Sequence, residues 1–539
     1  MGFFEEYKNT FLTDVLEHAG LIEFKEQLPQ STTQSDIEKN VTLEQSCNSF
    51  SSEDNKSRDN SSSSINCISD NHFLVKWNGE NDPEYPINWS TTKKIIINTL
   101  VIFYTCINYM GASVSTAGQK QIQEEFHVGH VTATLILSMY VLGYGVGPII
   151  LAPLSEVASI GRQQIYIISF FLFTIFQIAC ATVNNIGGLI VLRFFAGFLC
   201  SPALAIVGAT IVDMFEGRDF TPLIGLWSIG CVLAPVIAPL IGACMVVAKD
   251  WRWIFWLMTF LSTFCLFFLT ILFPETSHAT ILARRARRLR KQTGDNRYYT
   301  EQERLDSLVT TKEFLIATFY RPFKIIIQEP VILVFDIYLS VTYGILYLFF
   351  EAFPIVFTGI YNFTLIELGI SYMGFCVGSV FAYIILLLFT FKLVNPRRDN
   401  GTFTPEVYLI ILMSVGWLMP LSLFLFGWTA SVHWILAMIS EAFFMIACFN
   451  LFQAIFSYFA EGYPKYVASV YAGNSFMRSS FACAFPLFGT AMYNNLAIEG
   501  YPIGWGSSLV GFFTIALAIT PFILYKYGPA LRARSKFTD

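Results

Sequence analysis

Apolar residues in this chain are gathered into long, uniform runs, and polar residues fill the segments between them. A helix needs roughly 20 apolar residues to cross the hydrocarbon core of a bilayer, whereas a membrane β-strand needs about ten residues of alternating polarity. Twelve runs of the first kind follow Trp89. The pattern therefore predicts an all-α membrane protein with twelve transmembrane helices. The runs cover approximately 95–115, 131–152, 165–183, 188–211, 224–246, 253–273, 331–350, 366–389, 406–427, 433–455, 468–492 and 505–525.

The polar segments divide these runs into two groups of six, an organisation typical of two bundles that rock about a central site. We expect a six-helix bundle over 93–273 and a second one over 331–526. A basic central loop, 274–330, joins the two bundles, and a short tail, 527–539, ends the chain.

The first 92 residues form a polar N-terminal tail. Apolar residues recur at steps of three and four from Phe4 to Leu16, so residues 3–19 are expected to form an amphipathic helix ended by Gly20. This helix either packs under the bundle, the arrangement we favour, or touches the membrane surface. The stretch 31–70, rich in Ser, Asn and acids, buries too little apolar area to offset the entropy of ordering. The tail is therefore expected to be partly disordered.

Lys and Arg residues predict the orientation, because short loops that carry them stay in the cytosol. They are concentrated between the sixth and seventh runs and after the last run, whereas the opposite loops hold few, such as Lys120, Lys249 and Arg252. Both termini are therefore predicted to be cytosolic. The basic residues of the expected cytosolic side include Arg162, Arg218, Arg284, Arg285, Arg287, Arg288, Arg290, Lys291, Lys392, Lys465 and Arg532.

Composition excludes several classes of function. The 539 residues are 54% hydrophobic and 14% charged, with a mean hydropathy of +0.54, which is too apolar for a soluble enzyme. The net charge of -5 comes without a basic face for nucleic acid. The Gly-Lys pair of a phosphate-binding loop never occurs, so an ion gradient rather than ATP is the expected energy source. No His, Cys and acid cluster has metal or triad spacing, so we expect no metal, no cofactor and no enzymatic activity.

Five ionisable residues stand out inside or at the ends of the apolar runs, where insertion scales assign a charge about 2.5–3.5 kcal/mol. They are Arg193, Asp336, Glu351, Glu441 and Arg478. They either lock helices together as ion pairs or serve as proton and substrate-charge sites at a central cavity. The first six runs hold no acid at mid-depth, so a proton site is expected in the second half, with Glu441 the best candidate and Asp336 next. Arg193 must pair with backbone carbonyls, with amides such as Asn98 or Asn108, or with an acid of the second half.

The fifth run combines small residues with two prolines. The small residues stand at four-residue steps, and the prolines between them remove amide donors, so this helix is expected to press on a neighbour while bending. The residues are Gly230, Ala234, Pro235, Ala238, Pro239 and Gly242. The abundant aromatic residues suit a cavity for bulky amphipathic molecules better than one for sugars. Candidate cavity residues are Tyr109, Trp227, Tyr343, Tyr347, Phe350 and Phe444.

Several motifs resemble those of the fungal twelve-span drug:proton antiporters of the major facilitator superfamily. The residues are Trp77-Asn78-Gly79, Asn88-Trp89, Gly147-Pro148, Glu156, Gly161-Arg162, Arg193, Gly197, the run from Gly230 to Gly242 and Pro274-Glu275-Thr276. The stretches 347–357 and 505–511 are especially similar to the yeast members that give resistance to fluconazole and benomyl. The gate motif departs from the family in having Glu156 for Asp and a longer spacing before Gly161.

The resemblance implies the major facilitator fold and proton-coupled export of azoles such as fluconazole, of benomyl and of other xenobiotics across the plasma membrane. By the resemblance, Arg193 takes part in proton coupling, Glu156 and Arg162 belong to a cytosolic gate, and the helix with Pro235 and Pro239 sets the direction of export. Small amphipathic drugs and the lipid bilayer are then the partners, and the proton gradient supplies the energy.

Two other functions remain open. An exporter of an endogenous metabolite, such as a polyamine or an organic acid, would share this architecture, although a polyamine carrier should show more acids toward its cavity. A non-transporting membrane sensor would signal through the long N-terminal tail. Deletion of residues 1–76 separates the two classes, because a sensor would lose its output whereas a transporter would keep its flux.

Overall fold

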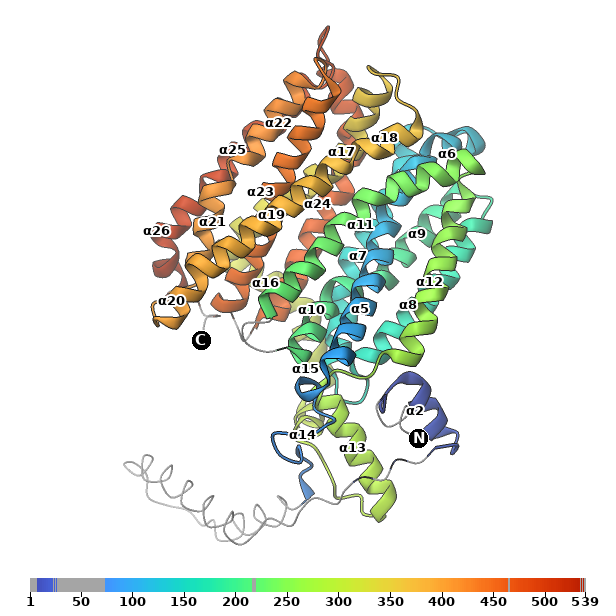
Figure 1. Ribbon diagram of the computed structural model, residues 1–539, viewed down its shortest axis with the longest axis vertical. Coiled ribbons are helices and arrows are strands. Elements are labelled where there is room, and N and C mark those ends of the chain that lie inside the picture. The colour runs from blue at the N-terminus through green and yellow to red at the C-terminus, as the bar shows by residue number, and fades with distance from the viewer. Residues whose placement is uncertain are drawn as a thin grey trace.

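The computed structural model describes residues 7–22, 24, 26, 73–215, 220–463, 466–533, 535 and 537. Long helices stand side by side in two bundles, one coloured blue to green and the other yellow to red (Figure 1). Helices are required because an unpaired backbone amide or carbonyl in lipid costs several kcal/mol, and a helix satisfies these groups within one segment. The stretch 31–70, predicted to be disordered, lies outside the described residues.

The first bundle contains six crossings. The first helix continues past a 3₁₀ turn into a short helix, and the fourth crossing is broken at Ser201, where Pro202 begins a new helix. The elements are α5 (Thr91–Ser113), η3 (Val114–Gly118), α6 (Gln119–Phe126), α7 (His130–Glu156), α8 (Gly161–Thr182), α9 (Ile186–Cys200), α10 (Pro202–Met214), α11 (Phe220–Ala248) and α12 (Arg252–Leu272).

The second bundle also contains six crossings, four of them built from two or more consecutive helical pieces. The elements are α17 (Pro330–Phe353), η6 (Pro354–Thr358), α18 (Leu365–Ser371), α19 (Met373–Phe389), η7 (Thr390–Val394), α20 (Asn395–Asp399), α21 (Val407–Val415), α22 (Leu418–Thr429), α23 (Trp434–Gly462), α24 (Val467–Asn495), α25 (Gly504–Ala518) and α26 (Thr520–Arg532).

Among the described residues, eleven helical stretches are long and apolar enough to cross a membrane. Helix α24 is a twelfth of similar length, 29 residues, and it is less apolar because Asn474, Ser475 and Arg478 interrupt it. It packs between α17 of its own bundle and α7 of the other, so its polar residues face protein rather than lipid. The arrangement matches the twelve predicted crossings.

Side chains are distributed as expected for a protein whose solvent is lipid. Large aromatic side chains are exposed on the outer surfaces of the bundles, such as Phe264 and Phe267 of α12 and Phe513 of α25. Polar side chains such as Gln177 and Asn450 are fully buried. Soluble proteins rarely expose apolar side chains in this number, so these outer surfaces are expected to face lipid.

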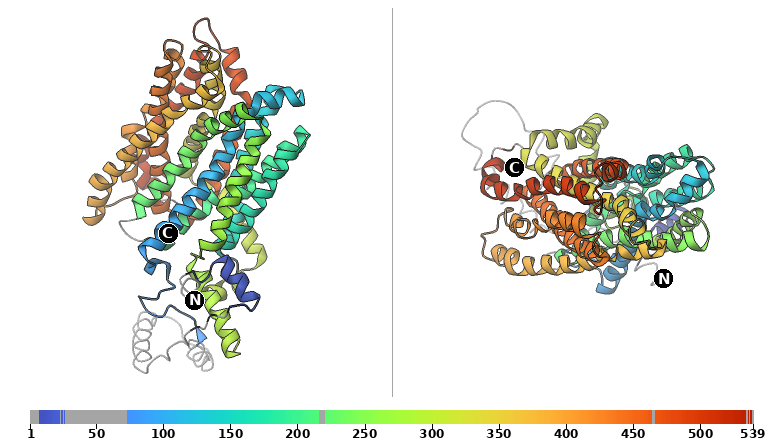
Figure 2. Two further views of the ribbon diagram at one scale, coloured as in Figure 1. Left: turned by 45° about the vertical axis from the view of Figure 1, so that its right-hand side comes forward. Right: turned by 90° about the horizontal axis from the view of Figure 1, so that it is seen from above.

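Both termini lie at the same end of the bundles, together with the segment that joins them (Figure 2). We call this the basal end and the opposite one the distal end. The joining segment was predicted as a loop, but it contains α13 (His278–Thr293), α14 (Glu301–Leu308), α15 (Thr311–Leu315), η5 (Ile316–Tyr320) and α16 (Arg321–Gln328). Thr300 with Glu303, and Thr310 with Glu313, form capping boxes that begin α14 and α15.

Of the predicted helix 3–19, residues 3–6 lie outside the described residues, residues 7–10 are not helical and Phe11–His18 form α2. Helix α2 ends, as expected, before Gly20, whose φ is 72°. Thr10 caps it, because its side chain accepts the Thr13 amide. Backbone pairing of Thr10 with Pro274 attaches the helix to the basal end of α12. The helix thus packs under the first bundle, the favoured one of the two predicted arrangements.

Candidate functional site

Four tyrosines from both bundles meet at the boundary between them. The hydroxyl oxygens of Tyr144 in α7 and Tyr343 in α17 lie 3.4 Å apart, and those of Tyr343 and Tyr347 lie 3.3 Å apart. The ring of Tyr109 in α5 packs edge-on against Tyr144 with centroids 5.5 Å apart. We call these four residues the tyrosine cluster. Each hydroxyl can donate or accept, so the cluster links the bundles without a fixed direction.

Arg478 of α24 places a cation beside the tyrosine cluster. Its guanidinium carbon lies 4.8 Å from the ring centre of Tyr343, 5.3 Å from that of Phe452 and 5.9 Å from that of Phe456. Its Nε has no hydrogen-bond partner among the described residues. The aromatic faces of Tyr343, Phe452 and Phe456 therefore stabilise this buried charge by cation–π interactions.

Asp336 lies close to the same strip of α24. Asn474, one turn before Arg478, donates a 2.7 Å hydrogen bond from Nδ2 to Oδ1 of Asp336 in α17. Asp336 is fully buried, and its Oδ2 has no partner in the described part of the chain. An acid, an amide and a guanidinium thus adjoin aromatic rings. This set is suited to stacking on a planar amphipathic molecule and to holding a proton on the half-satisfied carboxylate.

The other predicted cavity residues have separate positions. Trp227 of α11 donates from Nε1 to the Thr105 hydroxyl of α5 at 3.2 Å. Phe350 packs against Tyr347, with centroids 5.8 Å apart, and so extends the tyrosine cluster distally. Phe444 is fully buried within the second bundle, 5.1 Å from Phe349 between ring centres. The structure therefore brings Tyr109, Tyr343 and Tyr347 together at the bundle boundary, with Phe350 beside them. Trp227 is bonded within the first bundle, and Phe444 lies in the core of the second.

Arg193 of α9 is fully buried inside the first bundle and bonds backbone carbonyls, the first of the three alternatives that the sequence left open. Nε donates to the carbonyl of Ile136 at 3.1 Å, and Nη2 donates to the carbonyls of Gly111 at 2.7 Å and Ala112 at 3.3 Å. Its guanidinium lies 4.2 Å from the ring centre of Tyr140. Nη1 has no partner among the described residues, so its two N–H donors are unpaired there.

The two remaining acids lie in different parts of the second bundle. Glu441 of α23 is fully buried within the second bundle against Gly374 of α19, and neither carboxylate oxygen has a partner in the described residues. A carboxyl group in such surroundings is stable only in its neutral form. Glu351 of α17 lies at the distal end, where Thr490 of α24 donates to its Oε2 at 2.7 Å. Glu351 also faces Thr134 of the first bundle.

The gate motif lies where α7, α8 and α9 pack. An added Cβ at Gly147 would lie 2.1 Å from the Ser201 hydroxyl, and one at Gly197 would lie 2.0 Å from the Tyr140 carbonyl, so these helices touch through glycine. Glu156 is exposed at the basal end of α7. Arg162, at the basal end of α8, forms an ion pair with Asp213 of α10. The motif therefore adjoins the basal mouth of the first bundle.

Buried Glu275, from the Pro274-Glu275-Thr276 motif, fixes the start of α8. Its carboxylate accepts the backbone amides of Arg162 at 3.2 Å and Gln163 at 3.3 Å, and also those of Thr276 and Ser277 at 3.0 Å each. Gly161 adopts a φ of 76°, and its missing Cβ leaves room for this carboxylate. A carboxylate at a helix N-terminus also stabilises the helix dipole.

The small-residue face of α11 packs on α5 and η3 as the spacing predicted. Gly242 approaches Val114 so closely that a Cβ would lie 2.5 Å from its carbonyl oxygen. Pro239 has no amide to donate to the Pro235 carbonyl one turn earlier. The Ser113 hydroxyl of α5 donates to that carbonyl at 2.5 Å instead. The proline thus creates an interhelical hydrogen bond.

Arg284, Arg285 and Arg288 of α13 form ion pairs with acids of the N-terminal segments at the basal end. Arg285 donates to both carboxylate oxygens of Asp82 at 2.8 and 3.1 Å and to Glu84 at 2.9 Å. Burial raises the pKa of Asp82, but the Arg285 hydrogen bonds and two backbone amides outweigh burial, so the pKa falls below its usual value. Burial likewise raises the pKa of Glu84, and the charges of Lys8 and Arg285 more than reverse this.

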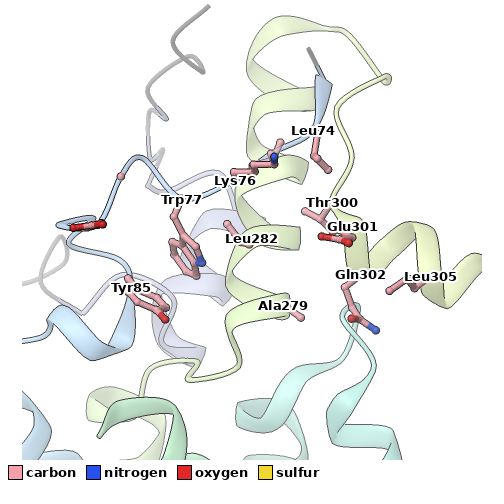
Figure 3. A pocket seen from close by; sticks show the side chains of 13 residues that line it. Leu74, Lys76, Trp77, Tyr85, Ala279, Leu282, Thr300, Glu301, Gln302 and Leu305 are labelled. Atoms are coloured by element: carbon pink, nitrogen blue, oxygen red, sulfur yellow. The ribbon is translucent and has the colours of Figure 1, made fainter. Parts of the chain in front are cut away.

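A groove of about 790 Å³ lies beside this ion-pair network (Figure 3). Trp77 and Tyr85 form one wall, Leu282 of α13 forms the floor, and residues 300–302 with Leu305 form the other wall. The groove lies outside the membrane-spanning helices and contains no residue of the tyrosine cluster. It is therefore separate from the candidate transport site.

Sequence reasoning missed several polar residues of the site, namely Tyr144, Asn474, Thr134, His130 and Thr490. Asn474 and Arg478 stand four residues apart, a spacing that places both on one face of α24 and that the sequence displays. The partners across helices, such as Thr134 with Glu351, depend on bundle packing. Within the described residues, no group of three or more His, Cys, Asp or Glu side chains is placed to hold a metal.

The family model described as "Major Facilitator Superfamily" matches residues 101–486 of this chain. The chain is 55% identical to "Fluconazole resistance protein 1" of Saccharomyces cerevisiae, with all of both chains covered. It is 60% identical to "Multidrug transporter FLR1" of Candida glabrata over 86% of this chain and 84% of that one. It is 41% identical to "Cycloheximide resistance protein" of Candida maltosa over 93% of this chain and 92% of that one.

Among solved structures, the chain is similar to a partially occluded inward-open conformation of the xylose transporter XylE from E. coli. The TM-score is 0.54 with 15% identical residues, and the match covers 80% of this chain and 99% of that one. A likeness at this identity concerns the fold. Together with the family match, it confirms the predicted twelve-helix fold of two six-helix bundles.

Proposed function

Because this chain belongs to the Major Facilitator Superfamily, whose members are transporters rather than enzymes, we propose that it exports structurally diverse drugs in exchange for protons. The cargo includes azoles such as fluconazole, benomyl and other xenobiotics. The names of relatives that cover 86% or more of this chain support drugs as the cargo. The structural observation that carries the proposal is the tyrosine cluster with Arg478, because side chains from both bundles meet there around aromatic faces.

Aromatic faces explain how one site accepts different drugs. Stacking on Tyr109, Tyr144, Tyr343 and Tyr347 requires a flat or bulky apolar body but no fixed pattern of hydrogen bonds. The tyrosine hydroxyls and Asp336 then supply adaptable polar contacts to heterocyclic nitrogens. Rocking of the bundles separates Tyr144 from Tyr343. Binding of the drug at these residues is thereby coupled to whether the site opens to the basal or to the distal end.

Proton exchange uses a buried carboxyl group of the second bundle, Asp336 or Glu441. Asp336 accepts a hydrogen bond from Asn474, which lies one turn before Arg478 in α24, so a proton on Asp336 and a drug bound beside Arg478 influence one another through this strip of α24. Glu441 is as fully buried as Asp336, and neither of its carboxylate oxygens has a hydrogen-bond partner in the described residues. Arg193 contributes the fixed positive charge of the first bundle. No cofactor takes part, and the proton gradient is the energy source.

The protein is a multi-pass membrane protein, and we place it in the plasma membrane with the basal end in the cytosol. The arginines of α13 support this orientation, since short basic segments stay on the cytosolic side. Small amphipathic drugs reach the tyrosine cluster from the cytosol or the inner leaflet and leave at the distal end. The ion-pair network of α13 then lies in the cytosol.

An exporter of an organic acid is the second candidate function. Arg478 favours it, because a buried guanidinium whose Nε lacks a partner in the described residues could bind a carboxylate. Efflux assays with a labelled organic acid and with fluconazole distinguish the two cargoes.

The test is efflux of labelled fluconazole from a yeast strain without its own drug pumps, with and without a protonophore. We expect energy-dependent efflux that the protonophore abolishes. Asp336→Asn should lower this efflux, whereas Glu124→Gln, a change at an exposed acid outside the site, should not. A protein that reaches the cell surface and exports no drug would refute drug export. Efflux that persists with the protonophore would refute proton coupling.

A further inference from the structure

The distal ends of the two bundles are joined by a small polar contact around Glu351. Its Oε1 accepts the Thr134 hydroxyl of α7 at 3.3 Å, and its Oε2 lies 3.3 Å from Nε2 of His130 in the same helix. Thr490 of α24 supports the carboxylate from its own bundle at 2.7 Å. The contact therefore exists only while the distal ends of α7 and α17 are together.

Exposure differs sharply across this contact. The Glu351 side chain is 4% exposed, whereas that of His130 is 40% exposed. Closing the distal end thus moves a carboxyl group out of water and leaves its histidine partner in reach of the outer solution. Burying an ionised carboxylate without a compensating charge costs several kcal/mol, so the closed contact favours either a neutral carboxyl group or a protonated histidine.

Both favoured forms contain one more proton than the separated groups hold at neutral pH. In water, a glutamate with a pKa of about 4.3 is ionised and a histidine with a pKa of about 6.5 is mostly neutral. Closure therefore takes up one proton, either as the O–H of Glu351 or as the added N–H of His130. Outside the protein one O–H bond of a hydronium ion breaks, and water remains.

We propose that Glu351 and His130 form a proton-binding latch that takes up a proton from outside as the distal end closes. The proposal rests on proton-coupled drug export as the function. It assigns the outer proton-uptake step to a pair that bridges the two bundles, separate from the tyrosine cluster. After drug release, a low outer pH favours the closed distal end and returns the transporter toward the cytosol.

A small cavity lies between the latch and the surroundings of Arg193. It holds about 10 Å³, close to the volume that one water molecule needs, and is lined by Ser115, Thr116, Gln119, Ala133, Thr134, Leu137 and Glu351. The Ser115 hydroxyl lies 3.3 Å from Nη2 of Arg193. Glu351 and Ser115 line the same cavity, and Ser115 contacts the guanidinium of Arg193.

Other groups around the latch are polar but neutral. Gln119 of α6 donates to the Thr134 hydroxyl at 2.6 Å and so fixes its orientation. The Tyr372 hydroxyl, between α18 and α19, is close enough to interact electrostatically with Glu351. His130 and Tyr372 are the titratable neighbours of Glu351 in the described part of the chain.

The test uses the full chain in proteoliposomes and compares two modes of fluconazole transport. Accumulation against a gradient, driven by an imposed pH difference, requires proton exchange, whereas exchange of labelled for unlabelled drug requires none. Glu351→Gln should lose pH-driven accumulation and keep drug exchange. His130→Gln should keep accumulation with its outer-pH profile moved by about one unit toward acid, because Glu351 must then be protonated without its partner.

Matched controls are Glu124→Gln and His127→Asn, which change an exposed acid and a second histidine at the same end of the first bundle. Both should behave like wild type. Wild-type pH-driven accumulation in Glu351→Gln would overturn the latch. If Glu351→Gln does not fold, an unchanged pH profile in His130→Gln overturns it and an acid-shifted profile supports it. Absence of pH-driven accumulation in the wild type would instead refute the proposed function.

Discussion

Alanine at Gly197 should weaken the packing of α9 on α7, and the structure gives the scale of the effect. The added Cβ would lie 2.0 Å from the Tyr140 carbonyl oxygen, whereas carbon and carbonyl oxygen normally approach to about 3.3–3.6 Å. The two backbones must therefore separate by about 1 Å or more. Overpacking of this kind costs about 1–3 kcal/mol, and the helical preference of alanine over glycine returns roughly 0.5–1 kcal/mol.

Gly208 of α10 provides the matched control, because an added Cβ there meets no atom within 4 Å. Gly208→Ala should stabilise the protein by about 0.5–1 kcal/mol, and Gly197→Ala should destabilise it by about 1–2 kcal/mol. Thermal unfolding of the purified protein in detergent gives both signs in one experiment. A midpoint that rises equally in both variants would refute the close α7–α9 contact on which the gate geometry depends.

Three further changes test contacts outside the tyrosine cluster. Ser113→Ala should lower the unfolding midpoint, because a Pro235 carbonyl left without a donor costs roughly 1–3 kcal/mol; an unchanged midpoint would contradict the interhelical bond. Glu275→Gln should cost about 3 kcal/mol by uncharging the buried acceptor of four backbone amides, measured by the same melts. Because the pKa of Asp82 is lowered in the folded state, its stabilising effect is complete above the unfolded pKa and is lost as pH falls through the folded one. The melting temperature of wild type should therefore drop on acidification, and Arg285→Gln should flatten that drop; equal slopes would contradict the pairing.

The crossings could be predicted from the sequence because lipid imposes a length and a uniform polarity on each helix. The break at Ser201 and the helices of the central segment were missed. The central segment was predicted as a loop because it is highly charged. Its sequence nevertheless contains two helix-start motifs, since Thr300 with Glu303 and Thr310 with Glu313 have the capping-box spacing. Helix α24 could be predicted because its sequence is apolar on balance, although Asn474 and Arg478 interrupt it.

The candidate site was only partly predictable. A buried charge signals itself by its position within an apolar run, so Arg193, Asp336 and Arg478 could be singled out from the sequence. Their partners could not, because the Asn474–Asp336 hydrogen bond joins helices that are 138 residues apart in the chain. Hydroxyl pairs such as Tyr144 with Tyr343 depend on how the bundles face one another, which no local pattern encodes.

Drug-driven proton movement in proteoliposomes tests the central claim most directly. The purified chain is reconstituted with a pH-sensitive dye inside the vesicles, and a fluconazole gradient is imposed without any pH difference. The account predicts that protons move opposite to the drug and that a protonophore collapses the resulting pH change. Fluconazole movement with no change in internal pH would contradict proton-coupled export.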